Sequence, residues 1–215
     1  MIILKVTFCV HGVVSPLIAN IYIDAFDQFM MTRGHRMVRY ADDILILKRS
    51  QKAAEHVRKL ATNYLEEKLK LTVNQKKTHI TAGFKGVKFL GVKIYTRYTR
   101  IQENKVKAFK EKVRKITRRN SPINLETVIK ELNPISRGFA NYFRIANCKI
   151  VFRDLAKWIR RRLRAKQLTL WKRPGRLHRH LRALGYKGKY MKIKMRSWRN
   201  SHSVMANYAL QNDWF

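Results

Sequence analysis

Two adjacent aspartates, Asp42 and Asp43, are the side chains of this sequence best suited to chemistry. They stand between two apolar runs, residues 37–40 and 44–47, and this pattern predicts a hairpin whose turn carries both carboxylates. Carboxylate oxygens are good ligands for Mg²⁺. A pair of Mg²⁺ ions can activate an attacking hydroxyl and stabilise a leaving pyrophosphate, which is nucleotidyl transfer. The alternative is a solvated turn without chemistry, since aspartate is common in turns.

Basic side chains form the second candidate site. Arginines and lysines crowd the region from residue 160 onward, and Trp158, Trp171 and Trp198 are interleaved with them. This mixture predicts contacts to RNA phosphates and rings able to stack on unpaired bases. A solvated basic face with core aromatics is the alternative, and the core role is favoured for Trp158 because it lies on an apolar helix face. The candidate RNA-binding residues of this region are Arg160, Arg161, Arg162, Arg164, Lys172, Arg173, Arg176, Arg179 and Arg182.

The charge of the whole chain favours a polyanionic partner. Of its 215 residues, 48 are lysine or arginine and 13 are aspartate or glutamate, a formal charge of +35. This charge argues against an ordinary metabolic enzyme acting on small neutral substrates. Residues 101–215 carry 30 basic and 6 acidic side chains, and no acid lies between Asp154 and Asp213. The second half of the sequence is therefore expected to hold a phosphate-binding surface.

The elements that must position these residues change character near residue 100. Residues 1–100 alternate between helix and strand: a helix beginning at Ser15-Pro16 with the serine hydroxyl as its cap, the hairpin, a helix from residue 50 to 65, and strands near 71–73 and 87–94. The apolar face of the first helix is expected at Leu17, Ile18, Ile21, Tyr22, Ala25 and Phe29.

Residues 101–215 predict a helical region. Apolar spacing predicts helices over 106–116, 125–132, 139–143 and 151–163, and the second of these is expected to stop before Pro134. Beyond Trp171 the pattern weakens into a basic tail, with a short helix around 203–211. We therefore expect an α+β fold with domains at 1–100 and 101–215.

Several segments resemble the proteins that group II introns encode. Four of them, in order, are similar to successive reverse-transcriptase motifs: residues 11–22, the tetrad Tyr40-Ala41-Asp42-Asp43, residues 71–78 ending in Lys77-Thr78, and Phe89-Leu90-Gly91. Residues 132–143, LNPISRGFANYF, are similar to the signature of the maturase domain, also called domain X. The resemblance covers nearly the whole chain.

The resemblance implies a fold and two activities. Residues 1–100 would be the C-terminal part of a right-hand polymerase palm, and residues 101–215 an α-helical thumb and RNA-binding maturase domain. The activities are Mg²⁺-dependent RNA-directed DNA polymerisation, a nucleotidyltransferase reaction on an RNA template and a DNA primer, and binding of the protein's own intron RNA for splicing and mobility.

The family motifs also imply roles for single residues. Asp42 matches the catalytic metal-binding aspartate and Asp43 its neighbour. Tyr40 and Ala41 match positions near the primer end and the incoming nucleotide, and Lys77 matches the lysine of a later palm motif. The primer-gripping hairpin corresponds to Phe89, Leu90 and Gly91, and Arg137 of the maturase signature is a further RNA-binding candidate.

Two departures from the family pattern predict an incomplete catalytic site. Val10-His11-Gly12 stands where the family has Gln-Gly-Gly, which affects the nucleotide contact of that glutamine. A two-metal palm also uses an aspartate from a strand well upstream, and no acid precedes Asp24. We expect a fragment that does not polymerise DNA alone, with another polypeptide as a candidate source of fingers and upstream palm. The alternatives are an RNA-binding maturase-like splicing factor only, or a non-functional remnant of a mobile element.

Other features predict a cytoplasmic protein without a membrane partner. Residues 1–10 are too short an apolar stretch to span a bilayer. Cys9 and Cys148 offer neither metal-ligand spacing nor a disulfide framework, which fits a reducing compartment. His178 and His180 have no cysteine or acid near in sequence to complete a metal site, so we expect no metal there.

Overall fold

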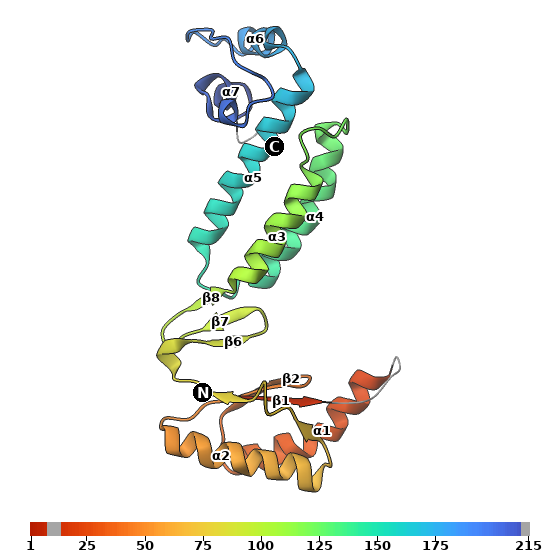
Figure 1. Cartoon of the computed structure of the whole chain (residues 1–215), viewed down its shortest axis with the longest axis vertical. Coiled ribbons are helices and arrows are strands. Elements are labelled where there is room, and N and C mark those ends of the chain that lie inside the picture. The colour runs from red at the N-terminus through yellow and green to blue at the C-terminus, as the bar shows by residue number, and fades with distance from the viewer. Residues whose placement is uncertain (8–13, 212–215) are drawn as a thin grey trace. The chain divides into compact units, whose positions relative to one another are not determined.

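The computed structural model describes residues 1–7 and 14–211, apart from the side chains of Thr7, Ser15 and Pro16, and the chain divides into two compact units, residues 1–100 and 101–215 (Figure 1). The architecture is α+β, as the sequence predicts, with antiparallel strands in the first unit and helices in the second. The helix predicted from Ser15 does begin there, but Val14 occupies its N-cap position; the side chain of Ser15 and the departure at Val10-His11-Gly12 lie outside the described part of the chain.

The first unit is built on an antiparallel sheet in the order β2-β3-β1-β4, with β5 also paired to β1. The hairpin predicted around the aspartates is confirmed: β2 (Met37–Tyr40) pairs with β3 (Asp43–Ile46). The central strand is β1 (Ile2–Thr7), which pairs with β3, β4 (Thr72–Val73) and β5 (His79–Ile80). The apolar start of the chain is therefore core strand, and its register places Lys5 opposite Asp43.

Helices α1 (Ser15–Thr32) and α2 (Gln51–Asn63) cover one face of this sheet, and α2 continues into a π-helical turn, Tyr64–Lys68 (Figure 1). Ile23, Phe26 and Met30 are the buried residues of α1. The predicted apolar face was wrong for the first turns, because Leu17 and Ile21 are more than half exposed. The stripe that meets the sheet begins only at Ile23.

A smaller sheet covers the other face. Its strands are β6 (Val87–Phe89), β7 (Val92–Ile94) and β8 (Thr99–Ile101), preceded by a 3-10 turn, Gly83–Lys85. Val87 and Phe89 pack against Ile3 and Leu45 of the first sheet. The turn between β6 and β7 has Leu90 at φ +45° and Gly91 at φ +78°. A leucine in this left-handed region is uncommon, since only glycine adopts it without steric cost.

Three long helices form the core of the second unit: α3 (Glu103–Ile116), α4 (Leu125–Phe143) and α5 (Lys149–Trp171). The prediction that a helix stops before Pro134 was wrong, because α4 runs through it. Pro134 is exposed, whereas Leu132 and Phe143 are buried on either side of it. Packing of the apolar face therefore outweighs the backbone hydrogen bond that proline cannot donate.

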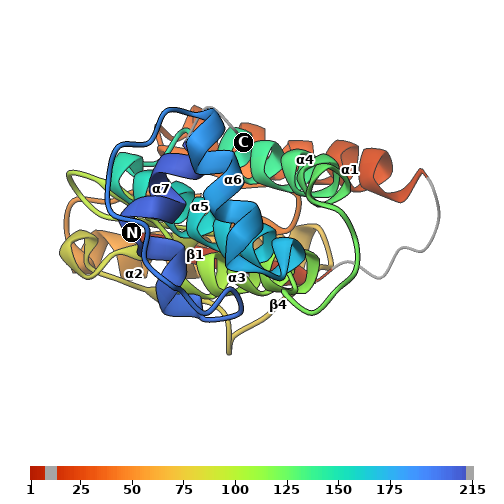
Figure 2. The same cartoon turned by 90° about the horizontal axis from the view of Figure 1, so that it is seen from above.

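The region after Trp171 is folded and not a tail. It contains α6 (Pro174–Ala183), a 3-10 helix at Trp198–His202 and α7 (Val204–Ala209), which Ser203 caps as its side chain accepts from Ala206 N. Figures 1 and 2 show α6 and α7 side by side. Leu177 and Leu181 of α6 pack with Met205 in a small core of their own. In the described part of the chain, every helix is too short or too polar to cross a bilayer.

Candidate functional site

The acidic turn consists of Ala41, Asp42 and Asp43. Ala41 adopts φ +50° in the turn between β2 and β3, and Asp42 is exposed at its tip. The backbone carbonyl of Asp42 accepts a 3.1 Å hydrogen bond from Val6 N, which fastens the turn to β1. The hairpin thus brings the predicted residues Tyr40, Ala41, Asp42 and Asp43 together.

Lys5 lies directly across from the acidic turn. Its Nζ is 2.5 Å from Asp43 Oδ1, and the two side chains are 35% and 22% exposed. The pairing follows from the register of β1 on β3, since directly opposed side chains lie on the same face of a sheet. Asp43 is therefore already neutralised by a cation of the chain itself.

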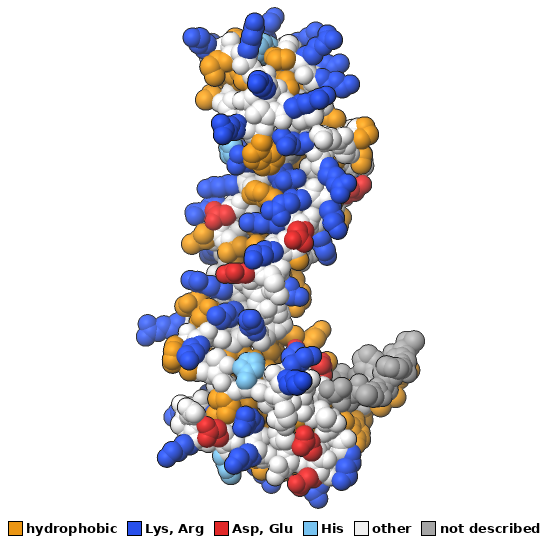
Figure 3. Space-filling model, in the orientation of Figure 1, with side chains coloured by type: hydrophobic (Ala, Val, Ile, Leu, Met, Phe, Trp, Pro, Cys, Tyr) orange, Lys and Arg blue, Asp and Glu red, His pale blue; other side chains and the backbone are white. Residues whose placement is uncertain are grey.

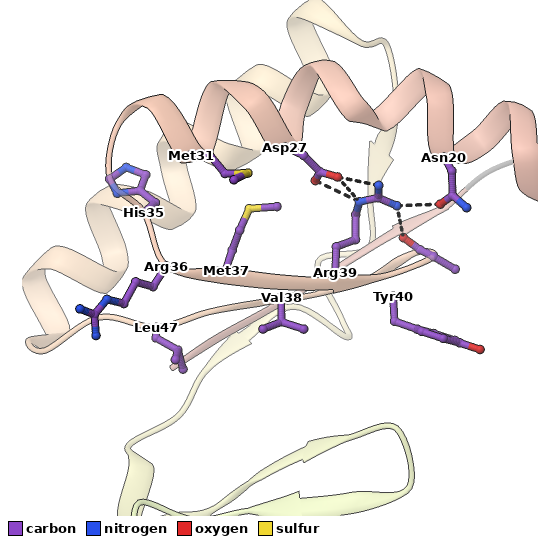
Figure 4. A pocket seen from close by; sticks show the side chains of 11 residues that line it. Asn20, Asp27, Met31, His35, Arg36, Met37, Val38, Arg39, Tyr40 and Leu47 are labelled. Carbon is purple, nitrogen blue, oxygen red and sulfur yellow. Dashed lines mark hydrogen bonds and ion pairs between the residues drawn. The ribbon is translucent and has the colours of Figure 1, made fainter. Parts of the chain in front are cut away.

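A second ion pair holds the hairpin to α1. Arg39 on β2 donates from Nε and Nη2 to the carboxylate of Asp27, at 2.6 to 3.0 Å, and from Nη1 to Asn20 Oδ1 at 2.9 Å. Figure 4 shows Asp27 pointing from α1 toward Arg39, with Val38 and Tyr40 pointing the other way. These residues line a groove of about 900 Å³. Sequence reasoning missed this ion pair. The available signal was an acidic residue, Asp27, four positions after the apolar Ile23 and therefore on the same helix face.

The predicted basic residues of the second unit divide into two groups. Arg160, Arg161, Arg162 and Arg164 on α5 are only partly exposed. The other group is exposed: Arg137 on α4, Lys172 and Arg173 after α5, and Arg176, Arg179 and Arg182 on α6. In Figure 3, lysine and arginine side chains outnumber acidic ones over the elements of this unit.

Arg162 and Arg164 make internal hydrogen bonds. Arg162 Nε donates to Thr117 Oγ1 at 2.6 Å, and Arg164 Nε donates to Leu210 O at 2.8 Å. Burial lowers the pKa of both guanidinium groups. These two arginines therefore help to hold the fold, and their contact with RNA stays a prediction.

Two indole rings lie among cations. Lys110, Arg114 and Arg162 stand over Trp158, with each charged group 5.3 to 5.8 Å from the ring centroid. Arg119, Arg161 and Arg162 stand over Trp198 at 4.8 to 5.5 Å. Sequence reasoning missed Lys110, Arg114 and Arg119, because only the fold brings α3 and its following loop to these rings. The i, i+4 spacing of Lys110 and Arg114 was the one available signal.

The two histidines of α6 are bound to backbone. His178 Nε2 lies 3.3 Å from Met191 O, and His180 Nε2 lies 3.1 Å from Ala209 O. His180 also packs on the ring of Trp171. Both histidines therefore have contacts within the folded region that follows α5.

Comparison with known proteins assigns both halves. Residues 11–94 match the family model "Reverse transcriptase (RNA-dependent DNA polymerase)", and residues 106–185 match "Group II intron, maturase-specific domain". The chain belongs to the group II intron reverse transcriptase and maturase family. It is also 30% identical to Protein YkfC of Escherichia coli (strain K12) over 44% of this chain and 34% of that protein. The chain thus spans about a third of the length of this curated relative.

Reverse transcriptases generally use Mg²⁺, but the acidic turn does not fit a two-metal site. Asp42 offers an exposed carboxylate, and Asp43 is paired with Lys5. Among the residues described, His, Cys, Asp and Glu side chains form no group of three or more that could hold a metal ion. Two divalent ions need several oxygen ligands, and a lysine ammonium at the same place repels them.

The other reverse-transcriptase positions lie outside the acidic turn. Lys77 is exposed between β4 and β5, where its backbone N–H donates to Asn74 O at 3.1 Å. Phe89 is buried between the two sheets, and Leu90 with Gly91 forms the turn of the β6–β7 hairpin. Their contacts with nucleotide and primer stay predictions.

Proposed function

We propose that this chain acts as an RNA-binding maturase, which binds structured intron RNA for splicing and mobility through its helical thumb and maturase domain and does not polymerise DNA alone. The palm assignment of residues 1–100 is part of the same proposal. Support for it comes from the two family matches and from the distribution of charge.

The observation that carries the proposal is an exposed arginine row on α6. Arg176, Arg179 and Arg182 follow one another at intervals of three residues on α6, and Arg173 is the residue just before the helix. All four are exposed, while Leu177 and Leu181 of α6 are buried. Residues three apart lie near one another on a helix surface. Each arginine of α6 therefore neighbours the next, and the row presents an oblique stripe of guanidinium groups, which can bind phosphate oxygens in bidentate fashion.

The ion pair at the acidic turn supports the second half of the proposal. A polymerase needs its aspartates free to hold Mg²⁺ at the primer end. Here Lys5 forms an ion pair with Asp43, so only the carboxylate of Asp42 is left, and one carboxylate offers too few oxygen ligands for two divalent ions. We expect no primer extension on an RNA template by the purified chain.

A complemented reverse transcriptase is the second candidate. Val14, Leu17, Ile18 and Ile21 form an exposed apolar face on and just before α1, each more than half accessible. Exposed apolar patches of this kind mark interaction sites. In this candidate a second polypeptide binds that face, and primer extension that appears only when that polypeptide is added would support it.

The test is a salt titration of binding to structured intron RNA. The triple change Arg176→Gln, Arg179→Gln and Arg182→Gln removes three cations of the row. The salt slope is the slope of the logarithm of the binding constant against the logarithm of the salt concentration. The triple change is expected to make this slope less steep by roughly 0.7 to 0.9 for each phosphate that the variant no longer neutralises. Asp42→Asn should leave the slope unchanged.

The matched control removes three exposed cations of the first unit, Lys52, Lys59 and Lys68, by change to glutamine. It lowers the net charge equally, so it reports non-specific attraction only. Equal effects of the two triple variants, or a flat salt response of the parent chain, would contradict the proposal.

A further inference from the structure

We propose a second phosphate-binding site for the RNA backbone in the indole–cation cluster. This cluster comprises Lys110, Arg114, Arg119, Trp158, Arg161, Arg162 and Trp198. The inference rests on the proposed function and deepens it by naming the surface and the part of the RNA that it contacts.

The cluster gathers cations from three places in the second unit. Lys110 and Arg114 lie one turn apart on α3, Arg119 follows the end of that helix, and Arg161 with Arg162 comes from α5. Arg162 touches both rings, 5.3 Å from the Trp158 centroid and 5.4 Å from the Trp198 centroid. The two indoles therefore join five positive groups into one continuous set.

Carboxylates are missing from this set. In the part of the chain that the structure describes, ion pairs link Lys5 with Asp43, Arg39 with Asp27, Lys130 with Glu126 and Arg153 with Asp154, and none reaches the cluster. Instead the cluster is held by neutral acceptors, as Arg119 donates to Arg196 O at 2.9 Å and Arg162 donates to Thr117.

Five like charges at close range repel one another, and the repulsion grows where water is excluded. The pKa of Arg162 is lowered first by its burial and then by the charges of Arg114 and Arg119. An anion bound across the cluster relieves this repulsion. Four of the five cations are only partly exposed and Arg114 is exposed, so a ligand reaches the set from the α3 side.

The rings identify which part of the RNA is contacted. A ring that stacks on a base needs an open face. Cations of the chain already lie over Trp158 and Trp198, so these indoles act as positioning residues that hold guanidinium groups by cation–π contact. The expected ligand is therefore the phosphate backbone, read without regard to base sequence. The cluster also lies largely within residues 106–185, the region matched to the maturase-specific domain.

The experiment compares two double variants on the same helix. Lys110→Gln with Arg114→Gln removes the α3 half of the cluster, and Lys105→Gln with Lys112→Gln removes two exposed cations that contact neither ring. Each protein is titrated with one RNA duplex and with single strands of two unrelated sequences, at a series of KCl concentrations. Equal thermal unfolding midpoints confirm that both variants fold.

The cluster variant should bind every probe more weakly and show a salt slope less steep by roughly 0.7 to 0.9 for each phosphate that the cluster no longer binds. The Lys105/Lys112 control should keep the parent slope. In addition, Trp198→Phe should retain parent affinity, because a benzene ring still holds the cations, whereas Trp198→Leu should behave like the cluster variant.

Several results would overturn this inference while leaving the proposed function intact. Two of them are equal salt slopes for the cluster variant and its control, and weakening of binding confined to one base sequence. Competition by polyglutamate as strong as that by RNA would also overturn it, in favour of an acidic protein partner. If the parent chain fails to bind RNA at all, the proposed function falls too. If the salt slope becomes less steep in the α6 triple variant but not in the cluster variant, only this inference fails.

Discussion

Replacing Lys5 with methionine should convert the acidic turn from a neutralised pair into a weak divalent-cation site. The change keeps the length of the side chain and removes its ammonium, which lies 2.5 Å from Asp43 Oδ1. The exposed Asp42 and the partly buried Asp43 then have no lysine opposite them, and their oxygens can bind a hard cation.

The size of the effect follows from the exposure of the pair. Two unit charges 4 Å apart near a protein surface attract by about 4 kcal/mol before desolvation and side-chain entropy are subtracted. Because Lys5 and Asp43 stay 35% and 22% exposed, solvent screening reduces the net contribution to about 1 kcal/mol. Loss of this contribution in Lys5→Met lowers the free energy of unfolding by the same amount, which in a chain of this size corresponds to a fall of about 3 °C in the thermal midpoint.

The assay is thermal unfolding with and without 10 mM Mn²⁺, at constant ionic strength. For a site with a Kd of about 1 mM, binding stabilises the folded chain by about 1.4 kcal/mol. We expect this gain in Lys5→Met and not in the parent. The double variant Lys5→Met with Asp43→Asn is the control, and it should lose the gain.

Mn²⁺ stabilisation of the parent equal to that of Lys5→Met would refute the reasoning, because it would mean that the lysine does not compete with a metal. A coupling energy near zero between Lys5 and Asp43 in the double-mutant cycle would refute the energetic part.

Three further predictions concern stability, each measured by urea unfolding. Lys166 is fully buried, and burial lowers its pKa from 10.5. Between its pKa in the folded chain and 10.5 the unfolded chain binds more protons, so the free energy of unfolding rises with pH. Lys166→Met should lose this rise, and parallel pH profiles of variant and parent would contradict the prediction. Asp27→Asn should destabilise the first unit by about 2 kcal/mol, because the Arg39 guanidinium loses its bidentate partner, and an unchanged midpoint would contradict that. Pro134→Ala should stabilise α4 by about 2 kcal/mol, since alanine restores the backbone donor; a decrease in stability would show that the proline shapes the helix.

Local sequence patterns predicted elements whose stabilising contacts are also local. The hairpin at 37–46 follows from apolar runs around two turn-forming residues, and α3 and α5 follow from apolar spacing. The same reasoning stopped α4 at Pro134, because a local rule cannot weigh the apolar contacts on both sides of that residue. It also missed α6, whose short apolar stripe of Leu177 and Leu181 is buried by Leu168 of α5 together with residues much later in the chain, such as Met205.

The sequence by itself determined the family, the strongly basic second half and the place of the acidic turn, because these depend on residue type and order. Only the tertiary structure decided which charges meet: strand register sets Lys5 against Asp43, and the packing of α3 beside α5 gathers cations around Trp158. Such contacts join residues far apart in the chain, and their energies depend on burial that no local pattern records. The sequence therefore presents two carboxylates suited to a metal, and the fold supplies the lysine that neutralises one of them.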